Sequence, residues 1–282
     1  MPHPVIFDRR LLRARLARAA AIGPATFLLD RAADEIAERL SAVLRTFDVA
    51  VDLGTPTDAV RRAIAGRVGT AVAVVADEEA LPFRDASLDL VVSALTLQHV
   101  NDLPGTLIQI RRALKPDGLF LAAMVGGESL AELRAAFAEA EAEVEGGVSP
   151  RVAPFADLRD LGALLQRAGF ALPVTDVDRI TVRYASPLAL MHDLRRMGAG
   201  NALTERRHTP LRRATLRRLL EIYGARFADP DGRIRATFEI VWLSGWAPHQ
   251  SQQQPLAPGS ARTRLADALR TQEISAGEKA GR

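Results

Sequence analysis

Two short segments place acidic side chains and a glycine where strands are expected to end. In VDLGTPTD, residues 51–58, Asp52 and Gly54 close an apolar run, and Asp77 and Glu78 follow the run GTAVAVVA. A glycine at a strand-to-helix turn lets the backbone approach a ligand and present amide hydrogens to it. A carboxylate at the end of a strand can accept hydrogen bonds from a ribose or an adenine amine. These residue types favour a nucleoside ligand.

Both segments also have an ordinary structural interpretation. Pro56 lacks an N–H group, and Asp58 would bring negative charge to a place where a ligand carboxylate or phosphate usually lies. The first segment can therefore be a plain turn between a strand and a helix. The acidic run 77–79 can equally be a solvated turn. The residues alone leave these alternatives open.

A third segment, ALTLQHVND at residues 94–102, could cover a ligand with Gln98 and His99. A lone histidine is more often structural than catalytic, so we assign no catalytic residue. Asn101 and Asp102 are better explained as caps of the helix that begins near Pro104. Farther along, Arg183, Tyr184, His192 and Arg195 are interpreted as surface positions on a strand and a helix, although they could line a substrate cleft.

The composition excludes several classes of protein. There are no cysteines, and only Lys115 and Lys279 among the 37 basic residues are lysine. Disulfides, thiolate metal sites, P-loops and Schiff-base chemistry are therefore not expected. The five histidines are scattered, so no metal site is expected. With a net charge of only +3 and arginines dispersed among acids, no nucleic-acid partner is expected.

Alternating strand and helix patterns must position these residues. Helical spacing of apolar residues alternates with short β-branched runs, which predicts an α/β fold with a mostly parallel sheet and helices on both faces. The run at 69–76 is nearly all small or β-branched, which predicts a strand covered on both faces. The longest apolar run, residues 119–125, is far shorter than the ~18 residues of a membrane span. The expected strands span residues 48–54, 69–76, 88–95, 119–125, 174–184 and 234–246, and the expected helices 9–21, 25–45, 58–67, 103–114, 129–145, 157–168, 187–197 and 209–227.

Three regions are expected along the chain. Residues 1–47 form N-terminal helices, residues 48–250 form the sheet domain, and residues 251–282 form a mostly disordered tail with a short helix near 264–270. A helical insertion of about residues 185–230 precedes the last strand. Residues 9–21 are rich in arginine and alanine, as in transit peptides, but Leu12, Leu16 and Ala19 recur at helical spacing and favour a helix of the fold.

The sequence resembles class I S-adenosylmethionine (SAM)-dependent methyltransferases over residues 88–134, which include the turn KPDG. It is similar, more closely, to the family of mitochondrial complex I assembly factor five, a family of arginine-hydroxylase and BioC-like methyltransferase type, and its bacterial members. The further marks are FDRRLLRARLARAA near the start, ADEEALPF, NDLPG, the GGESL–ELR segment, EVEGGVSPRVAPFADLRDLGALLQRAGF and GWAPHQSQQQPLAPGSA, so that the resemblance spans about residues 6–261.

The resemblance implies a Rossmann-like methyltransferase fold with a helical insertion before the last strand. It implies S-adenosyl-L-methionine as cofactor and a role in assembling respiratory complex I. It also implies a protein partner, an iron–sulfur subunit of that complex, of which the eukaryotic member hydroxylates an arginine. A bacterial, cytoplasmic protein is expected.

The sequence departs from the family pattern in three places. One is Gln98-His99, where the family usually has a His-Trp pair before Val-Asn-Asp. Pro56 and Asp58 stand where the glycine-rich turn has its later glycines, and only residues 59–70 separate this turn from the strand that leads to the acidic run. About one strand-and-helix unit is therefore missing. Either the strand 69–76 keeps the place of the family's third strand, or it lies beside the first strand and brings Asp77 to the ribose position. We prefer the second placement, because it leaves no gap in the sheet and a dozen residues suffice for one crossover.

Two functions follow from these residues. The leading interpretation is a SAM-dependent methyltransferase-like protein that acts on a protein substrate, with its cofactor held by Asp52, Gly54, Asp77, Glu78 and Gln98. The alternative is a non-catalytic assembly chaperone that kept the fold and lost the cofactor.

Overall fold

The computed structural model describes residues 5–75, 77–253, 260 and 263–272. The chain divides into two units, Met1–Pro248 and His249–Arg282. Among the described residues, no helix is long and apolar enough to cross a membrane. Much of the tail expected beyond residue 250 lies outside the described residues. The described part of the tail contains the short helix α9 (Leu265–Leu269).

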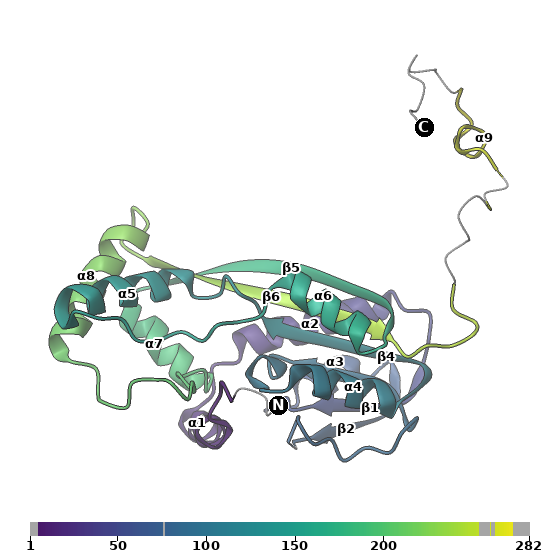
Figure 1. The fold of residues 1–282 in the computed structure, drawn as a ribbon, viewed down its shortest axis with the longest axis horizontal. Coiled ribbons are helices and arrows are strands. Elements are labelled where there is room, and N and C mark those ends of the chain that lie inside the picture. Colours follow the sequence, from purple (N-terminus) through teal and green to yellow (C-terminus); the bar gives the residue numbers. More distant parts are fainter. Residues whose placement is uncertain (1–4, 76, 254–259, 261–262, 273–282) are drawn as a thin grey trace. The chain divides into compact units, whose positions relative to one another are not determined.

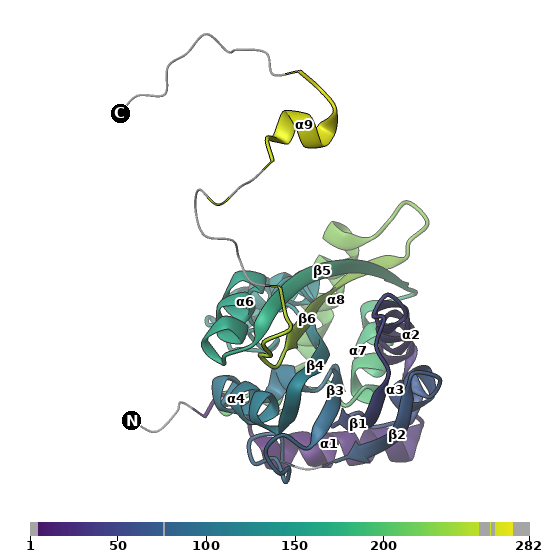
Figure 2. The same cartoon turned by 90° about the vertical axis from the view of Figure 1, so that its right-hand side faces the viewer.

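The first unit is built on one six-stranded sheet in the order β2-β1-β3-β4-β6-β5, with helices on both faces (Figures 1 and 2). The first four strands are parallel, and β6 and β5 add an antiparallel edge. The predicted Rossmann-like methyltransferase fold, with its helical insertion before the last strand, is confirmed. The strands are β1 (Phe47–Leu53), β2 (Val68–Val74), β3 (Leu88–Ala94), β4 (Leu114–Val125), β5 (Ala171–Tyr184) and β6 (Ile234–Trp246), and the helices are α1 (Arg9–Ile22), α2 (Phe27–Ser41), α3 (Ala59–Ile64), the 3₁₀ turn η1 (Leu97–His99), α4 (Leu103–Ala113), α5 (Ala131–Glu145), α6 (Leu158–Arg167), α7 (Pro187–Arg196) and α8 (Arg213–Phe227).

Strand β2 lies beside β1, which confirms the preferred placement. Asp52 pairs with Ala73 and Leu53 with Val74 in a parallel register. Because both strands therefore end at the same edge of the sheet, the acidic run that follows β2 comes next to the turn that follows β1. The expectation that β2 is covered on both faces was wrong: Val72 is 46% exposed, because β2 is an edge strand beside the six-residue helix α3.

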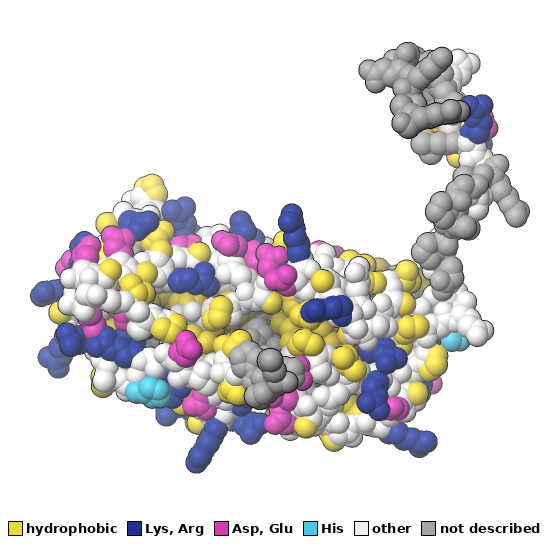
Figure 3. Space-filling model, viewed as in Figure 1, with side chains coloured by type: hydrophobic (Ala, Val, Ile, Leu, Met, Phe, Trp, Pro, Cys, Tyr) yellow, Lys and Arg dark blue, Asp and Glu magenta, His cyan; other side chains and the backbone are white. Residues whose placement is uncertain are grey.

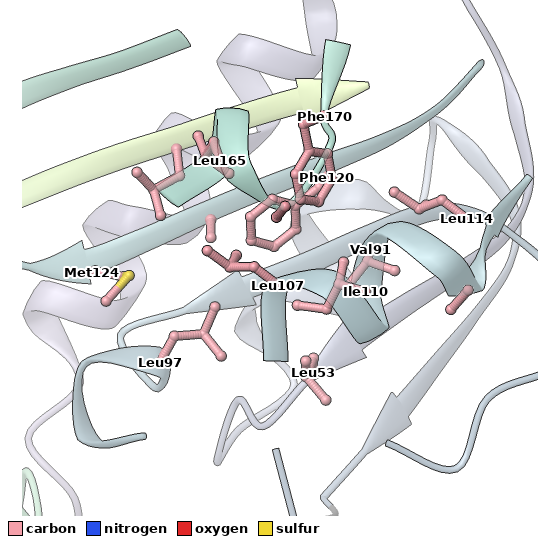
Figure 4. Close-up of a cluster of buried hydrophobic side chains, with 14 of the residues drawn as sticks. Leu53, Val91, Leu97, Leu107, Ile110, Leu114, Phe120, Met124, Leu165 and Phe170 are labelled. Carbon is pink, nitrogen blue, oxygen red and sulfur yellow. The ribbon is translucent and has the colours of Figure 1, made fainter. Parts of the chain in front are cut away.

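Successive side chains of the central strands point to opposite faces of the sheet, so alternate residues pack in two separate hydrophobic cores. Phe120 and Met124 of β4 pack with Leu107 of α4 and Leu165 of α6 on one face, as Figure 4 shows. Leu121 and its alternate neighbours pack against α2 and α3 on the other. Both faces of β4 are buried, which explains its continuous apolar sequence.

A third core lies where β5 and β6 extend beyond the parallel strands. Tyr184 of β5 and Phe238 of β6 pack there with α5, α7 and α8. The insertion thus has its own apolar support, and Figure 1 shows its helices grouped at that end of the sheet.

Several boundaries differ from the predicted elements, those of β4 and α3 among them. The turn 115–118 was expected to separate a helix from a strand, but β4 already begins at Leu114. Asp117 has a φ of +63° and donates its N–H to the Ala247 carbonyl, so the turn is an irregular start of the strand. Helix α3 ends at Ile64, three residues early, and Val68 belongs to β2.

Candidate functional site

A cavity of about 1010 Å³ lies at the edge of the sheet where β1, β2 and β3 end. Four of the five predicted site residues line it: Gly54, Asp77, Glu78 and Gln98. Asp52 does not, because it is fully buried in β1 beneath the turn. The other side of the cavity is formed by α1, by the C-terminal half of α7 and by residues 151–155.

Gly54 stands where the ends of three strands meet. Its φ is +80°, and a Cβ atom there would lie 2.9 Å from Thr96 Cγ2 and 3.1 Å from Glu78 Oε1. Its N–H donates to the Val74 carbonyl at 2.9 Å, which fixes the turn against β2. Only glycine fits both the backbone conformation and the space.

The acidic run is held by helix α1, although the Asp77 side chain remains 47% exposed. Arg9, whose side chain is only 15% exposed, lies 3.2 Å from Asp77 and 3.0 Å from Glu79, and it also pairs with Glu78. Arg13 lies 3.1 Å from Asp77. The spacing of the two arginines, four residues apart on one helix face, was the available signal for this contact. Their partners are almost seventy residues away along the chain, so the sequence did not reveal it.

Asp52 is a buried acid whose carboxylate oxygens accept no well-aligned hydrogen bond from a described residue, although Thr55 lies near enough to favour the charged form. Burial raises the pKa of Asp52 from 3.8 to about 6, and the nearby Thr55 and Arg61 only partly oppose this effect. Asp52 therefore loses its charge in weak acid, unlike an exposed aspartate.

We expect Asp52 to stabilise the fold as the pH falls. Because the pKa in the folded state lies above that in the unfolded state, the folded protein binds the proton more tightly, and the gain between about pH 7.5 and pH 5 is about 1 kcal/mol. Urea unfolding of the wild type and of Asp52→Asn at both pH values measures this change in the free energy of unfolding. Equal pH dependence in the two proteins would contradict the account.

Gln98 and His99 lie in the turn η1 after β3. The Gln98 side-chain amide donates to the Leu95 carbonyl at 2.6 Å, while its Oε1 is buried without a partner. His99 packs edge-on against Phe7, with ring centroids 5.4 Å apart. Burial, with a smaller contribution from Arg9, lowers the pKa of His99 to about 4. His99 is therefore neutral near pH 7.

The expected caps and surface positions have mixed outcomes. Asp102 caps α4 by accepting from the Gly105 N–H at 2.9 Å, as predicted, whereas Asn101 accepts from the N–H groups of Ile6 and Phe7. Arg195 lines the cavity. Tyr184 is buried in the third core and His192 is exposed, while Arg183 pairs with Asp229 and Asp231 outside the cavity lining. Among the described residues, no group of three or more histidine, aspartate or glutamate side chains could hold a metal ion.

Comparisons with known proteins place this chain in a family. A methyltransferase domain family model matches residues 34–122. The arginine-hydroxylase NDUFAF5 of Danio rerio is 37% identical over 286 residues, which cover 93% of this chain and 89% of that protein. The chain belongs to the NDUFAF5 family. The human member is 39% identical over 280 residues, covering 91% of this chain and 81% of the relative.

More distant relatives share only part of this chain. A malonyl-[acyl-carrier protein] O-methyltransferase of Halorhodospira halophila is 39% identical over 189 residues, which cover 67% of this chain and 62% of that enzyme. The YcgJ protein of Bacillus subtilis has the same fold, with a TM-score of 0.52 and 14% identity over 78% of this chain and 99% of that structure.

The methyltransferase fold implies SAM, and the residues present fit its ribose. The missing Cβ of Gly54 leaves room beside the Glu78 carboxylate, and that carboxylate lines the cavity. A carboxylate has about four lone-pair positions, so Glu78 can accept ribose hydroxyls while it remains paired with Arg9. The buried Asp52 oxygens, which accept no well-aligned hydrogen bond from a described residue, lie below the same turn. Pro56, which removes one N–H donor, is the feature that weakens this fit.

Proposed function

We propose that this protein modifies an arginine of a protein substrate during the assembly of respiratory complex I, with SAM as cofactor. The observation that carries the proposal is the single cavity that joins the predicted cofactor residues Gly54 and Glu78 to a second half built by α1, α7 and residues 151–155. A cofactor at the strand ends would then face a substrate held by the helices. The name of the NDUFAF5 relatives, arginine-hydroxylase, supports arginine as the modified group.

The chain's own residues prepare the cofactor half. Arg9 fixes the carboxylates of Asp77 and Glu78, so that they need not be ordered when a ribose binds. Gln98 closes the cavity beside them. When bound, SAM supplies an activated methyl group. The neutral His99 adds no positive charge next to this cationic cofactor.

A second candidate function is a non-catalytic assembly chaperone. Pro56 and Asp58 in the turn after β1 favour it, as do the ion pairs that already engage Asp77 and Glu78. A chaperone would keep the substrate half of the cavity without binding SAM. Measured SAM binding therefore separates the two functions.

Deleting the gene should lower the amount of assembled complex I, because an iron–sulfur subunit of the complex is the proposed substrate. Blue-native gels measure the complex, and mass spectrometry of that subunit shows whether an arginine peptide loses the mass of one CH2 unit, the net gain on methylation, or of one oxygen atom. The wild-type gene should restore both, and Gly54→Ala should restore neither. Unchanged complex I after deletion would contradict the proposal. Fractionation of the cells tests the proposed cytoplasmic location.

A further inference from the structure

Helix α1 faces the cavity with an apolar stripe between two pairs of arginines. At about 100° of rotation per residue, Leu12, Leu16 and Ala19 share one face of the helix. Arg9 and Arg13 lie on one side of this stripe and are neutralised by the acidic run. The second pair, Arg15 and Arg18, lies on the other side and lines the cavity as well.

The second pair has little counter-charge, because the attraction of Asp8 for Arg15 is weaker than the repulsion from Arg206 and Arg18. Neither Arg15 nor Arg18 makes a hydrogen bond or ion pair with any described residue, and Arg15 Nη1 is buried without a partner. Gly200 leaves room for the Arg15 side chain, because a Cβ atom on Gly200 would lie 2.9 Å from Arg15 Nη1. Burial, followed by repulsion from Arg206 and Arg18, lowers the pKa of Arg15. Arg195, in the last turn of α7, adds to the same cavity a third guanidinium that forms no ion pair with a described residue.

Arg15 is half-buried, whereas Arg18 and Arg195 are exposed. An anion would relieve the repulsion between these guanidinium groups, because like charges close together destabilise one another. The space beside them is too large for an inorganic ion and is mostly apolar, with side chains of Leu130, Leu133, Phe137 and Met191 in its lining. Its chemistry matches several residues of a peptide that combines apolar and acidic side chains. We propose that Arg15, Arg18 and Arg195 bind an acidic segment of the protein substrate. The inference rests on the proposed function, in which the substrate is a protein.

Fluorescence anisotropy with two short labelled peptides tests the inference. The first carries one arginine flanked by glutamates and leucines, and its twin has lysine in place of glutamate. The full-length protein should bind the acidic peptide and not the twin. The variant Arg15→Gln/Arg18→Gln should weaken binding about tenfold. The control Arg10→Gln/Arg217→Gln removes two exposed arginines outside the cavity lining and should change binding less than about twofold.

Three results would overturn the inference: equal binding of the two peptides, equal losses in the two double variants, or displacement of the peptide by inorganic phosphate, which would indicate a site for small anions.

Arg15→Gln should leave the melting temperature unchanged or higher, since its buried nitrogen has no partner among the described residues. If it unfolds the protein, Arg18→Gln/Arg195→Gln decides the question by the same binding assay. Peptide binding does not depend on catalysis, so a wild type that lacks SAM binding would contradict the proposed function alone.

Discussion

Replacing Gly54 by alanine is expected to abolish SAM binding and to lower the free energy of unfolding by about 2–4 kcal/mol. Two effects add. A side chain at a φ of +80° costs about 1–2 kcal/mol, and the new Cβ would meet Thr96 Cγ2 at 2.9 Å. It would also lie 3.1 Å from the Glu78 carboxylate, at the place assigned to the ribose.

Chemical denaturation and isothermal titration with SAM measure the two effects in the same protein preparation. Gly66→Ala is the matched control, because Gly66 follows α3, does not have a positive φ, and has open space where its Cβ would lie. That variant should bind SAM like the wild type and be equally or slightly more stable. A Gly54→Ala protein that binds SAM with wild-type affinity would refute the site.

His99 should make the protein less stable in weak acid. Its pKa falls from 6.5 to about 4 on folding, so the unfolded chain binds the proton first, and the cost between about pH 7.5 and pH 5 is about 2 kcal/mol. His99→Gln removes this loss. The variant should therefore lose less stability than the wild type when urea unfolding is repeated at the two pH values.

The wild-type profile alone would hide this behaviour, because Asp52 acts with the opposite sign over the same range of pH. The double variant Asp52→Asn/His99→Gln should lack both contributions. If His99→Gln and the wild type lose the same stability on acidification, the surroundings of His99 do not lower its pKa on folding, and the account is contradicted.

The sheet was largely predictable from the chain, because β4 has a continuous apolar run and β6 alternates polar and apolar residues before its own apolar run at 240–243, and both patterns depend on local sequence. The position of β2 beside β1 was predictable from the length of the connection between them, because a crossover of about a dozen residues can reach few other positions in the sheet. The exposure of β2 was not predictable, because a run of valine and alanine looks the same in an edge strand and in a central one.

The site was predicted in part, for a similar reason. Gly54, Asp77, Glu78 and Gln98 follow strands, and the rule that ligands bind at strand ends brings them together. Their neutralisation by Arg9 depends on a contact between distant segments, which no local pattern encodes. The burial of Asp52 likewise depends on how the turn packs above it.

The central claim is that a SAM site persists in a turn with a single glycine. Isothermal titration of SAM into the wild type and into Glu78→Gln tests it most directly, with Glu38→Gln, an exposed acid on α2, as the control. We expect micromolar binding in the wild type and the control, on the order of 8 kcal/mol, and at least a tenfold loss in Glu78→Gln. No detectable heat with the wild type, or equal affinity in all three proteins, would contradict the account.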